Sequence, residues 1–301
     1  MKKLGVAILG MGVVGGGTYK ILTDNREYFR RTQKLDITVE CVLERNRQRA
    51  LDLGVEEERI ASSIEEVISN PNVDVVVEVI GGIEPARSFV LQALMSGKTV
   101  VTSNKEMVCK HWYELEEEAK KMNAGLLFEA SCVGGVPIIR TLTDGTQANH
   151  ILSLVGIING TTNYILTKME QEGSDYASAL KEAQNLGYAE FNPTADVEGF
   201  DAAYKLSILS SMAFNKRIPL ENVYREGITK ITAEDIAYGK KLGYKIKLLA
   251  IGKDTPAGVE VRVHPAFVPA GEMLASVNDS FNAVKLVGDS VGEVMLYGRG
   301  A

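Results

Sequence analysis

Three carboxylates and one ammonium group lie within sixteen positions of one another in the middle of the chain: Glu190, Asp196, Asp201 and Lys205. Asp201 and Lys205 stand four residues apart at the start of the apolar run LSILSSMAF, so a helix would place both on one face. A lysine held beside a carboxylate can transfer a proton, and further carboxylates can bind an amine. The pattern favours a small substrate with both an amine and a transferable proton, although an ordinary surface ion pair would have the same spacing.

The elements around these side chains can be read from the glycines and the proline. Gly187 is expected to end a helix over 175–186, and Pro193 is expected to stiffen the loop that follows. Gly199 would then let the chain turn into a second helix over 199–214. The four ionisable groups are therefore predicted to lie on a loop between two helices and on the first turn of the second helix.

A second chemical motif lies near the N-terminus. Residues 4–9 (LGVAIL) are almost wholly apolar, as a strand covered on both faces would be, and GMGVVG follows directly. In this G-x-G-x-x-G pattern Gly10 permits a tight turn, Gly12 lets the backbone approach a pyrophosphate, and Gly15 lets the helix pack closely on the strand. The N-terminus of that helix offers amide donors for phosphates. The motif predicts a dinucleotide site.

Strands alternate with helices through the first part of the chain. This alternation predicts a doubly wound parallel sheet of the Rossmann type, which binds ligands at the carboxyl ends of its strands. Gly81-Gly82 and residues 102–105 fall at such ends, so Lys105 is placed to reach a cofactor or substrate. The predicted strands cover residues 4–9, 37–43, 74–80, 98–102 and 126–129, and the predicted helices cover 85–96 and 106–122.

The second part of the chain predicts an α+β domain with a mixed sheet. A turn over 159–163 is expected to lead into a helix over 164–170, with Asn163 or a threonine as its N-cap. The two domains are predicted over residues 1–135 and 136–301. The predicted strands are 151–158, 244–251, 259–263 and segments near 284–286 and 294–296; the predicted helices are 137–142, 164–170, 175–186, 199–214 and 233–242.

Composition excludes several functional classes. The 301 residues are 45% hydrophobic and 24% charged, which is ordinary for a soluble globular protein, and the net charge of −6 argues against nucleic acid. The three cysteines are not closely paired, which fits a reducing cytoplasm and no disulfide framework. The three histidines lack metal-ligand spacing, and no apolar stretch is long enough to span a membrane. We therefore expect a cytoplasmic protein.

The loop segment between the two helices carries a family resemblance. The order Ala183, Gly187-Tyr188-Ala189, Asn192-Pro193, Asp196-Val197, Gly199, Asp201 and Lys205 resembles the signature of homoserine dehydrogenases. The resemblance implies a reversible NAD(P)-dependent interconversion of L-aspartate 4-semialdehyde and L-homoserine, in threonine and methionine biosynthesis. Two alternatives remain open: a reductase of another amino-acid-derived carbonyl, and a non-catalytic relative that only binds a dinucleotide.

Charge complementarity with this substrate assigns expected roles to side chains. Glu190 is expected to bind the substrate ammonium, assisted by Asp196 or Asp201. Lys205 is expected to act as the general acid, oriented by Asp201, while Lys105 stabilises the developing oxyanion or shares the proton transfer. A lysine that acts near neutral pH would need its pKa lowered by burial or by a neighbouring cation. The residues expected to contact the coenzyme are Gly10, Gly12, Val13, Val14, Gly15, Arg45, Ser103, Lys105 and Gly187.

The choice of coenzyme depends on the end of the second strand. Glu44 could bind the ribose hydroxyls of NAD, whereas Arg45 and Arg47 could pair with the 2′-phosphate of NADP. The polar stretch 23–36 delays this strand, so spacing alone does not decide which residue faces the adenosine. NADP is the favoured coenzyme, and use of NAD stays open.

The segment 128–137 (FEASCVGGVP) joins the two predicted domains. It resembles the family segment that holds a monovalent cation such as sodium, with Glu129 and the carbonyl groups of Cys132, Gly134 and Val136 as the candidate ligands. A simple glycine-rich hinge is the alternative.

The resemblance continues through residues 261–265 to the closing segment 296–301 (LYGRGA). Family members go on with a further glycine and a Pro-Thr stretch, so we expect a C-terminally short member without a regulatory domain. The last residues are expected to return towards the cofactor domain. The second domain is expected to form a homodimer.

Overall fold

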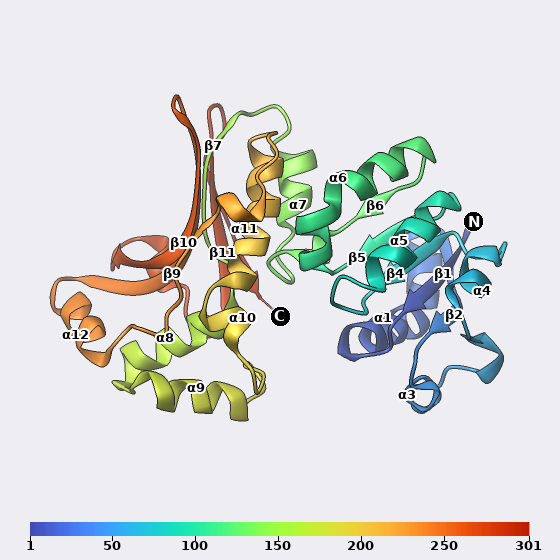
Figure 1. Ribbon diagram of the computed structural model, residues 1–301, viewed down its shortest axis with the longest axis horizontal. Helices are drawn as coiled ribbons and strands as arrows, with labels where there is room; N and C mark the ends of the chain where they lie inside the picture. The colour runs from blue at the N-terminus through green and yellow to red at the C-terminus, as the bar shows by residue number, and fades with distance from the viewer. Residues whose placement is uncertain (301) are drawn as a thin grey trace. The chain divides into compact units, whose positions relative to one another are not determined.

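The computed structural model describes residues 1–300 (Figure 1). The chain forms two compact units, Met1–Phe128 and Glu129–Ala301. Ala301, the last residue of the closing segment, lies outside the described residues. The loop over 129–136, which sequence predicts at the end of the first domain, belongs to unit 2.

Unit 1 is built on a six-stranded parallel sheet in the order β3-β2-β1-β4-β5-β6. This order and the parallel pairing confirm the predicted Rossmann-type fold. The strands are β1 (Lys2–Leu9), β2 (Leu35–Leu43), β3 (Ile60–Ala61), β4 (Val75–Glu78), β5 (Thr99–Thr102) and β6 (Leu126–Leu127).

The sheet of unit 1 is buried on both faces because its first strand is apolar at every inner position. Ala7 and Leu9 pack on one side with residues of α5 and α6, while Val6 and Ile8 pack on the other side with β2. This two-residue period is the physical basis of the predicted strand. The helices are α1 (Val13–Asp24), α2 (Arg26–Gln33), α3 (Arg47–Asp52), α4 (Ile64–Ser69), α5 (Ala86–Met95) and α6 (Lys105–Lys121), with the 3₁₀ turn η1 (Glu57–Arg59).

Unit 2 contains a mixed six-stranded sheet in the order β12-β11-β7-β9-β10-β8. Only the edge pair of β8 and β10 is parallel. The mixed sheet confirms the predicted α+β arrangement of the second half. The strands are β7 (Ile151–Ile157), β8 (Tyr224–Arg225), β9 (Tyr244–Thr255), β10 (Gly258–Pro269), β11 (Phe281–Gly288) and β12 (Gly292–Arg299).

The helices of unit 2 pack on this sheet and on one another; α8 and α9 lie side by side in Figure 1. The main ones are α7 (Ile138–Arg140), α8 (Gly160–Glu172), α9 (Tyr176–Asn185), α10 (Thr194–Val197), α11 (Phe200–Ala213) and α12 (Ala233–Lys241). Shorter turns are η2 (Glu129–Ser131), η3 (Thr141–Gly145), η4 (Leu220–Asn222) and η5 (Met273–Ser276).

One local prediction was wrong. The helix predicted over 164–170 begins earlier, at Gly160, so Asn159 and not Asn163 is its N-cap. The polar stretch 23–36 precedes most of β2, and α2 forms within it, with Arg26 and Arg30 contacting Asp36 at 2.7 and 3.0 Å.

Candidate functional site

The Gly-rich loop of unit 1 has the backbone that the motif predicts. Gly10 has a φ of +94°, which a residue with a side chain rarely adopts, and its N–H donates to Leu43 O at 2.8 Å. A Cβ on Gly15 would lie 1.9 Å from Gly10 O, so α1 can approach the loop only because Gly15 has none. Apart from Gly12 and its two chain neighbours, no atom of the described residues lies within 4 Å of a Cβ built on Gly12. The loop therefore leaves open space where a phosphate group would lie.

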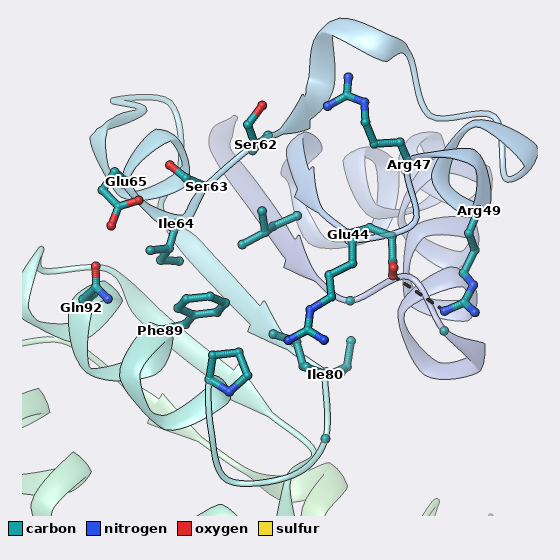
Figure 2. Close-up of a pocket in the computed structure, with 18 of the residues that line it drawn as sticks. Glu44, Arg47, Arg49, Ser62, Ser63, Ile64, Glu65, Ile80, Phe89 and Gln92 are labelled. Carbon is teal, nitrogen blue, oxygen red and sulfur yellow. Dashed lines mark ion pairs between the residues drawn. The ribbon is translucent and has the colours of Figure 1, made fainter.

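The end of β2 faces this loop and carries Glu44. One carboxylate oxygen of Glu44 accepts the Met11 N–H at 2.7 Å, and the other accepts the Asn46 N–H at 2.9 Å. Arg49 lies 3.9 Å from the same carboxylate, as the dashed line in Figure 2 marks. The side chain of Glu44 is only 9% exposed. Its two oxygens are thus already occupied by backbone donors of the protein.

A pocket of about 910 Å³ opens beside the loop and the end of β2 (Figure 2). Arg45, Arg47 and Ser62 are on its wall, and all three are exposed. Arg47 is tethered to Ile60 O at 3.3 Å, whereas no hydrogen bond or ion pair holds Arg45 among residues 1–300. The pocket has a size and exposed arginine side chains that suit the adenosine end of a dinucleotide.

The carboxyl ends of β4 and β5 form a second polar region of unit 1. Glu78 is fully buried and accepts the Thr102 hydroxyl at 2.6 Å and the Ile80 N–H at 2.8 Å. Asn104 caps α6 by accepting the Met107 N–H at 3.1 Å. Lys105 is the first residue of this helix and is half-buried. These contacts fix the predicted Ser103–Lys105 segment at the strand ends.

In unit 2 the predicted pair of Asp201 and Lys205 forms on α11. Gly199, with a φ of +78°, precedes the helix, so Asp201 lies in its first turn and Lys205 one turn later. The Lys205 ammonium lies 2.7 Å from Asp201 Oδ2 and donates to Ile158 O at 3.0 Å. Both residues are buried, at 9% and 3% exposure. An exposed ion pair would be worth little, but a buried pair has a fixed geometry.

Asn159 completes this cluster; sequence reasoning placed it in the turn over 159–163 but gave it no role in the site. Its amide donates to Asp196 Oδ1 at 2.7 Å and to Asp201 Oδ2 at 2.9 Å. Its carbonyl oxygen accepts the Thr162 N–H at 2.8 Å and so caps α8. One buried amide therefore holds two carboxylates that would otherwise repel each other. The signal that could have found it is the Asn-Gly pair that directly follows a predicted strand.

Glu190 does not join the cluster. It lies on the exposed loop between α9 and α10, and its main-chain oxygen accepts the Gln184 amide at 3.1 Å. Thr161 ties the same loop to α8 by donating to Tyr188 O at 2.6 Å. Gly187 ends α9 with a φ of +80°, as predicted. The carboxylate of Glu190 thus faces solvent, where it remains available to a ligand.

The loop over 129–136 has an unusual backbone. Val133 and Gly134 both have a φ near +57°, which is strained for a β-branched residue such as Val133. The two carboxylate oxygens of Glu129 accept the N–H groups of Ile139 and Arg140 at 2.9 and 2.8 Å. Burial raises the pKa of the Cys132 thiol to about 12, so the side chain stays neutral.

Neither a side-chain metal site nor a membrane-spanning helix is found among the described residues. Within residues 1–300 no group of three or more His, Cys, Asp or Glu side chains could hold a metal ion. No helix in the same residues is long and apolar enough to cross a membrane.

A parallel sheet with an open Gly-rich loop, followed by a unit with a buried lysine–aspartate pair, defines an NAD(P)-dependent oxidoreductase. Residues 10–129 match the family model "Homoserine dehydrogenase, NAD binding domain", and residues 137–301 match the model "Homoserine dehydrogenase". The chain belongs to the homoserine dehydrogenase family, which confirms the resemblance that the signature segment carries.

Individual relatives agree with this membership. A homoserine dehydrogenase of Bacillus subtilis is 43% identical over 301 residues, which are all of this chain and 70% of that protein. The structure of one from Thiobacillus denitrificans matches with a TM-score of 0.96 and 45% identity, over 100% of this chain and 70% of that one. A hyperthermophilic archaeal homoserine dehydrogenase in complex with NADPH matches with a TM-score of 0.83 and 27% identity, over 99% and 92% of the two chains.

Proposed function

We propose that this chain transfers a hydride reversibly between NADP(H) and L-aspartate 4-semialdehyde, and that Lys205 is its proton donor. The observation that carries the assignment is the buried cluster of Lys205, Asp201, Asn159 and Asp196 in unit 2. No other lysine in the part of the chain the structure describes combines burial with a carboxylate at 2.7 Å that is itself fixed by an amide.

The cluster supplies the proton that reduction needs. When bound, the coenzyme supplies the hydride to the aldehyde carbon, or accepts it in the reverse direction. The carbonyl oxygen then gains negative charge, and the Lys205 ammonium donates one proton to it, leaving a neutral amine that water reprotonates. Asp201 holds Nζ in place, and Asn159 holds Asp201. Oxidation of the alcohol uses the same groups in reverse, with the neutral amine as the base.

The substrate ammonium is assigned to carboxylates of the same unit. Glu190 faces solvent, and Asp196 is half-buried at the edge of the cluster. Together with Asp201 they form the anionic side of the proposed substrate site. For Lys105 the proposed role is to stabilise the developing oxyanion or to share the proton transfer.

The preference for NADP is supported by the end of β2. Each carboxylate oxygen of Glu44 already accepts one backbone N–H, so a ribose hydroxyl of NAD would have to share this carboxylate with the protein. Arg45 is exposed and lines the pocket, so it can pair with a 2′-phosphate. The NADPH complex of the archaeal relative agrees with this choice. NAD is proposed as the weaker coenzyme, contacted like NADP by Gly10 to Gly15, Ser103 and Gly187.

A monovalent cation such as sodium is proposed at the 129–136 loop. Each carboxylate oxygen of Glu129 accepts one N–H and retains a lone pair for a cation. The carbonyl groups of Cys132, Gly134 and Val136 are the other proposed ligands. Oxygen donors of this kind suit a hard cation and would fix the loop.

We propose that the two units have separate roles. Unit 1 would bind the dinucleotide, and unit 2 would bind the substrate and form a homodimer through its sheet. The proposed location is the cytoplasm, which fits three cysteines that are not closely paired in the sequence.

The test is Lys205→Ala, assayed with L-homoserine and NADP. Turnover is expected to fall roughly 10² to 10⁴-fold while the dissociation constant of NADPH is unchanged, because proton transfer is lost and the coenzyme unit is untouched. Lys216→Ala is the matched control, since Lys216 pairs with Asp254 on the exposed surface. Full turnover from a folded Lys205→Ala protein would refute the assignment.

A further inference from the structure

Glu44 stands where an acidic residue binds the ribose of NAD in many parallel-sheet dehydrogenases, so its contacts decide what it does here. Its carboxylate accepts the Met11 N–H from inside the Gly-rich loop at 2.7 Å. Its second oxygen accepts the Asn46 N–H of the following turn at 2.9 Å. One side chain thus joins two backbone segments that both line the coenzyme pocket.

The same loop has a second attachment to the end of β2. The Gly10 N–H donates to Leu43 O at 2.8 Å, one residue before Glu44. Two consecutive N–H groups of the loop, those of Gly10 and Met11, therefore bind two consecutive residues of the strand end. Gly12, the next residue, is the one with open space around it. The anchored part of the loop ends where the ligand space begins.

The charge of Glu44 is also compensated by the protein. Two charge-assisted hydrogen bonds from N–H groups and an ion pair with Arg49 at 3.9 Å stabilise the carboxylate in its largely buried position. A carboxylate stabilised in this way gains little from turning towards a ribose hydroxyl.

We propose that Glu44 is a positioning residue of the Gly-rich loop, which supports the binding of NADH and NADPH by the same factor and does not select between them. The inference deepens the proposed preference for NADP, because it leaves selection to Arg45. An acidic residue at the end of β2 usually indicates that NAD is the coenzyme. In this chain Glu44 is predicted not to indicate NAD use.

The experiment compares dissociation constants of NADH and NADPH, measured by fluorescence titration of the intact chain. Glu44→Ala is expected to weaken both coenzymes about ten- to a hundredfold, because the Met11 N–H loses a charged partner, and to change their ratio less than threefold. Glu44→Gln keeps one acceptor oxygen and should give an intermediate loss for both. Glu58→Gln, at an exposed position of the same unit, removes the same charge and should change neither.

Two outcomes would overturn the inference. A loss of NADH binding with NADPH unchanged or tighter would show that Glu44 binds the ribose. Unchanged binding of both coenzymes would show that the loop does not need this anchor. Circular dichroism and the melting temperature show whether Glu44→Ala is folded. If it is misfolded, the binding measurements on Glu44→Gln decide the question. A wild-type protein that binds NADH more tightly than NADPH would contradict the NADP proposal. An equal loss of affinity for both coenzymes in Glu44→Ala would still support the role proposed for Glu44.

Discussion

Asn159 is the residue on which the geometry of the proposed catalytic cluster depends. Replacing it with alanine removes the amide that holds Asp196 and Asp201 and also the N-cap of α8. We expect turnover to fall about ten- to a hundredfold and stability to fall by about 1 kcal/mol. Steady-state kinetics and thermal unfolding measure the two effects separately.

Asn159→Ser separates these roles, since serine is an equally good N-cap but has no amide to donate. Compared with Asn159→Ala, it should recover the cap's share of the stability, about 1 kcal/mol, and leave turnover low. Asp175→Ala removes the N-cap of α9 and should cost stability alone. If Asn159→Ser restores turnover as well, the amide has no part in positioning the carboxylates.

Arg45 carries the second prediction at this scale. Arg45→Ala should raise the KM for NADPH about ten- to a hundredfold and leave the KM for NADH within twofold, because only NADPH has the 2′-phosphate that an arginine binds. Arg31→Ala removes an exposed arginine of the same unit outside the pocket and serves as the control. Equal effects on the two coenzymes would mean that Arg45 does not read the 2′-phosphate.

Sequence reasoning found Asp196, Asp201 and Lys205 but not Asn159. The first three lie on one contiguous segment, where an i,i+4 spacing implies contact. Asn159 is 37 and 42 positions away from the two aspartates that it holds. A contact across that separation depends on the packing of α8 against α10 and of β7 against α11, which no local pattern specifies.

The helix α1 and its loop allow a test with three glycines. Gly12→Ala places a methyl group in space that the protein does not fill, so the fold should be unchanged while coenzyme binding falls at least tenfold. Gly15→Ala forces a contact with Gly10 O and should lower both stability and binding. Gly17→Ala, also without a neighbour within 4 Å, should bind normally and gain about 0.5–1 kcal/mol of stability. Normal NADPH binding by Gly12→Ala would place the phosphates elsewhere.

The strand β9 contains a buried lysine whose pKa makes stability depend on pH. Lys247 is 2% exposed and donates to Val277 O at 2.6 Å and Asn163 Oδ1 at 3.1 Å. Burial, and then the nearby Lys245, lower its pKa from 10.5 to about 8, and Glu170 and Asp279 oppose the shift. Holding this ammonium in the folded state therefore costs about 3 kcal/mol below pH 8.

Between pH 8 and 10.5 the unfolded chain binds more protons at this position than the folded chain does. The contribution of Lys247 to stability should therefore rise through that window and be constant below it. Denaturant titrations of the wild type and of Lys247→Met at several pH values measure the difference. If the two proteins show the same dependence from pH 8 to 10.5, Lys247 has an ordinary pKa.

Most strands of both sheets follow from apolar runs, but the two-residue strands β3 and β8 and the helix α2 were not predicted. The sequence of α2, REYFRRTQ, has no buried residue, and the helix is held to β2 by Arg26 and Arg30 on Asp36. Polar helices of this kind depend on partners outside themselves, which a periodicity cannot supply. The predicted ranges of β9 and β10 were also too short, because residues 252–255 are polar and residues 264–269 contain two prolines; antiparallel pairing orders both stretches.

At the scale of the molecule the prediction concerns assembly. A homodimer should elute with twice the mass of one chain in size-exclusion chromatography with light scattering, and should keep that mass on tenfold dilution. Part of the sheet of unit 2 carries a core cluster that includes Ile157, Leu249 and Ala283. A constant monomer mass at every concentration would exclude the dimer and assign this sheet a purely internal role.

The end of β12 lies against the first loop of unit 2. The Gly135 N–H donates to Arg299 O at 3.1 Å, and a Cβ on Gly134 would lie 2.1 Å from Gly300 O. The loop that opens the unit is thus completed by residues synthesised more than 160 positions later. During translation this loop must wait for Arg299 and Gly300 to leave the ribosome, whereas unit 1 can fold as soon as Phe128 has emerged. Order of synthesis therefore makes the coenzyme unit the first part of the protein to mature.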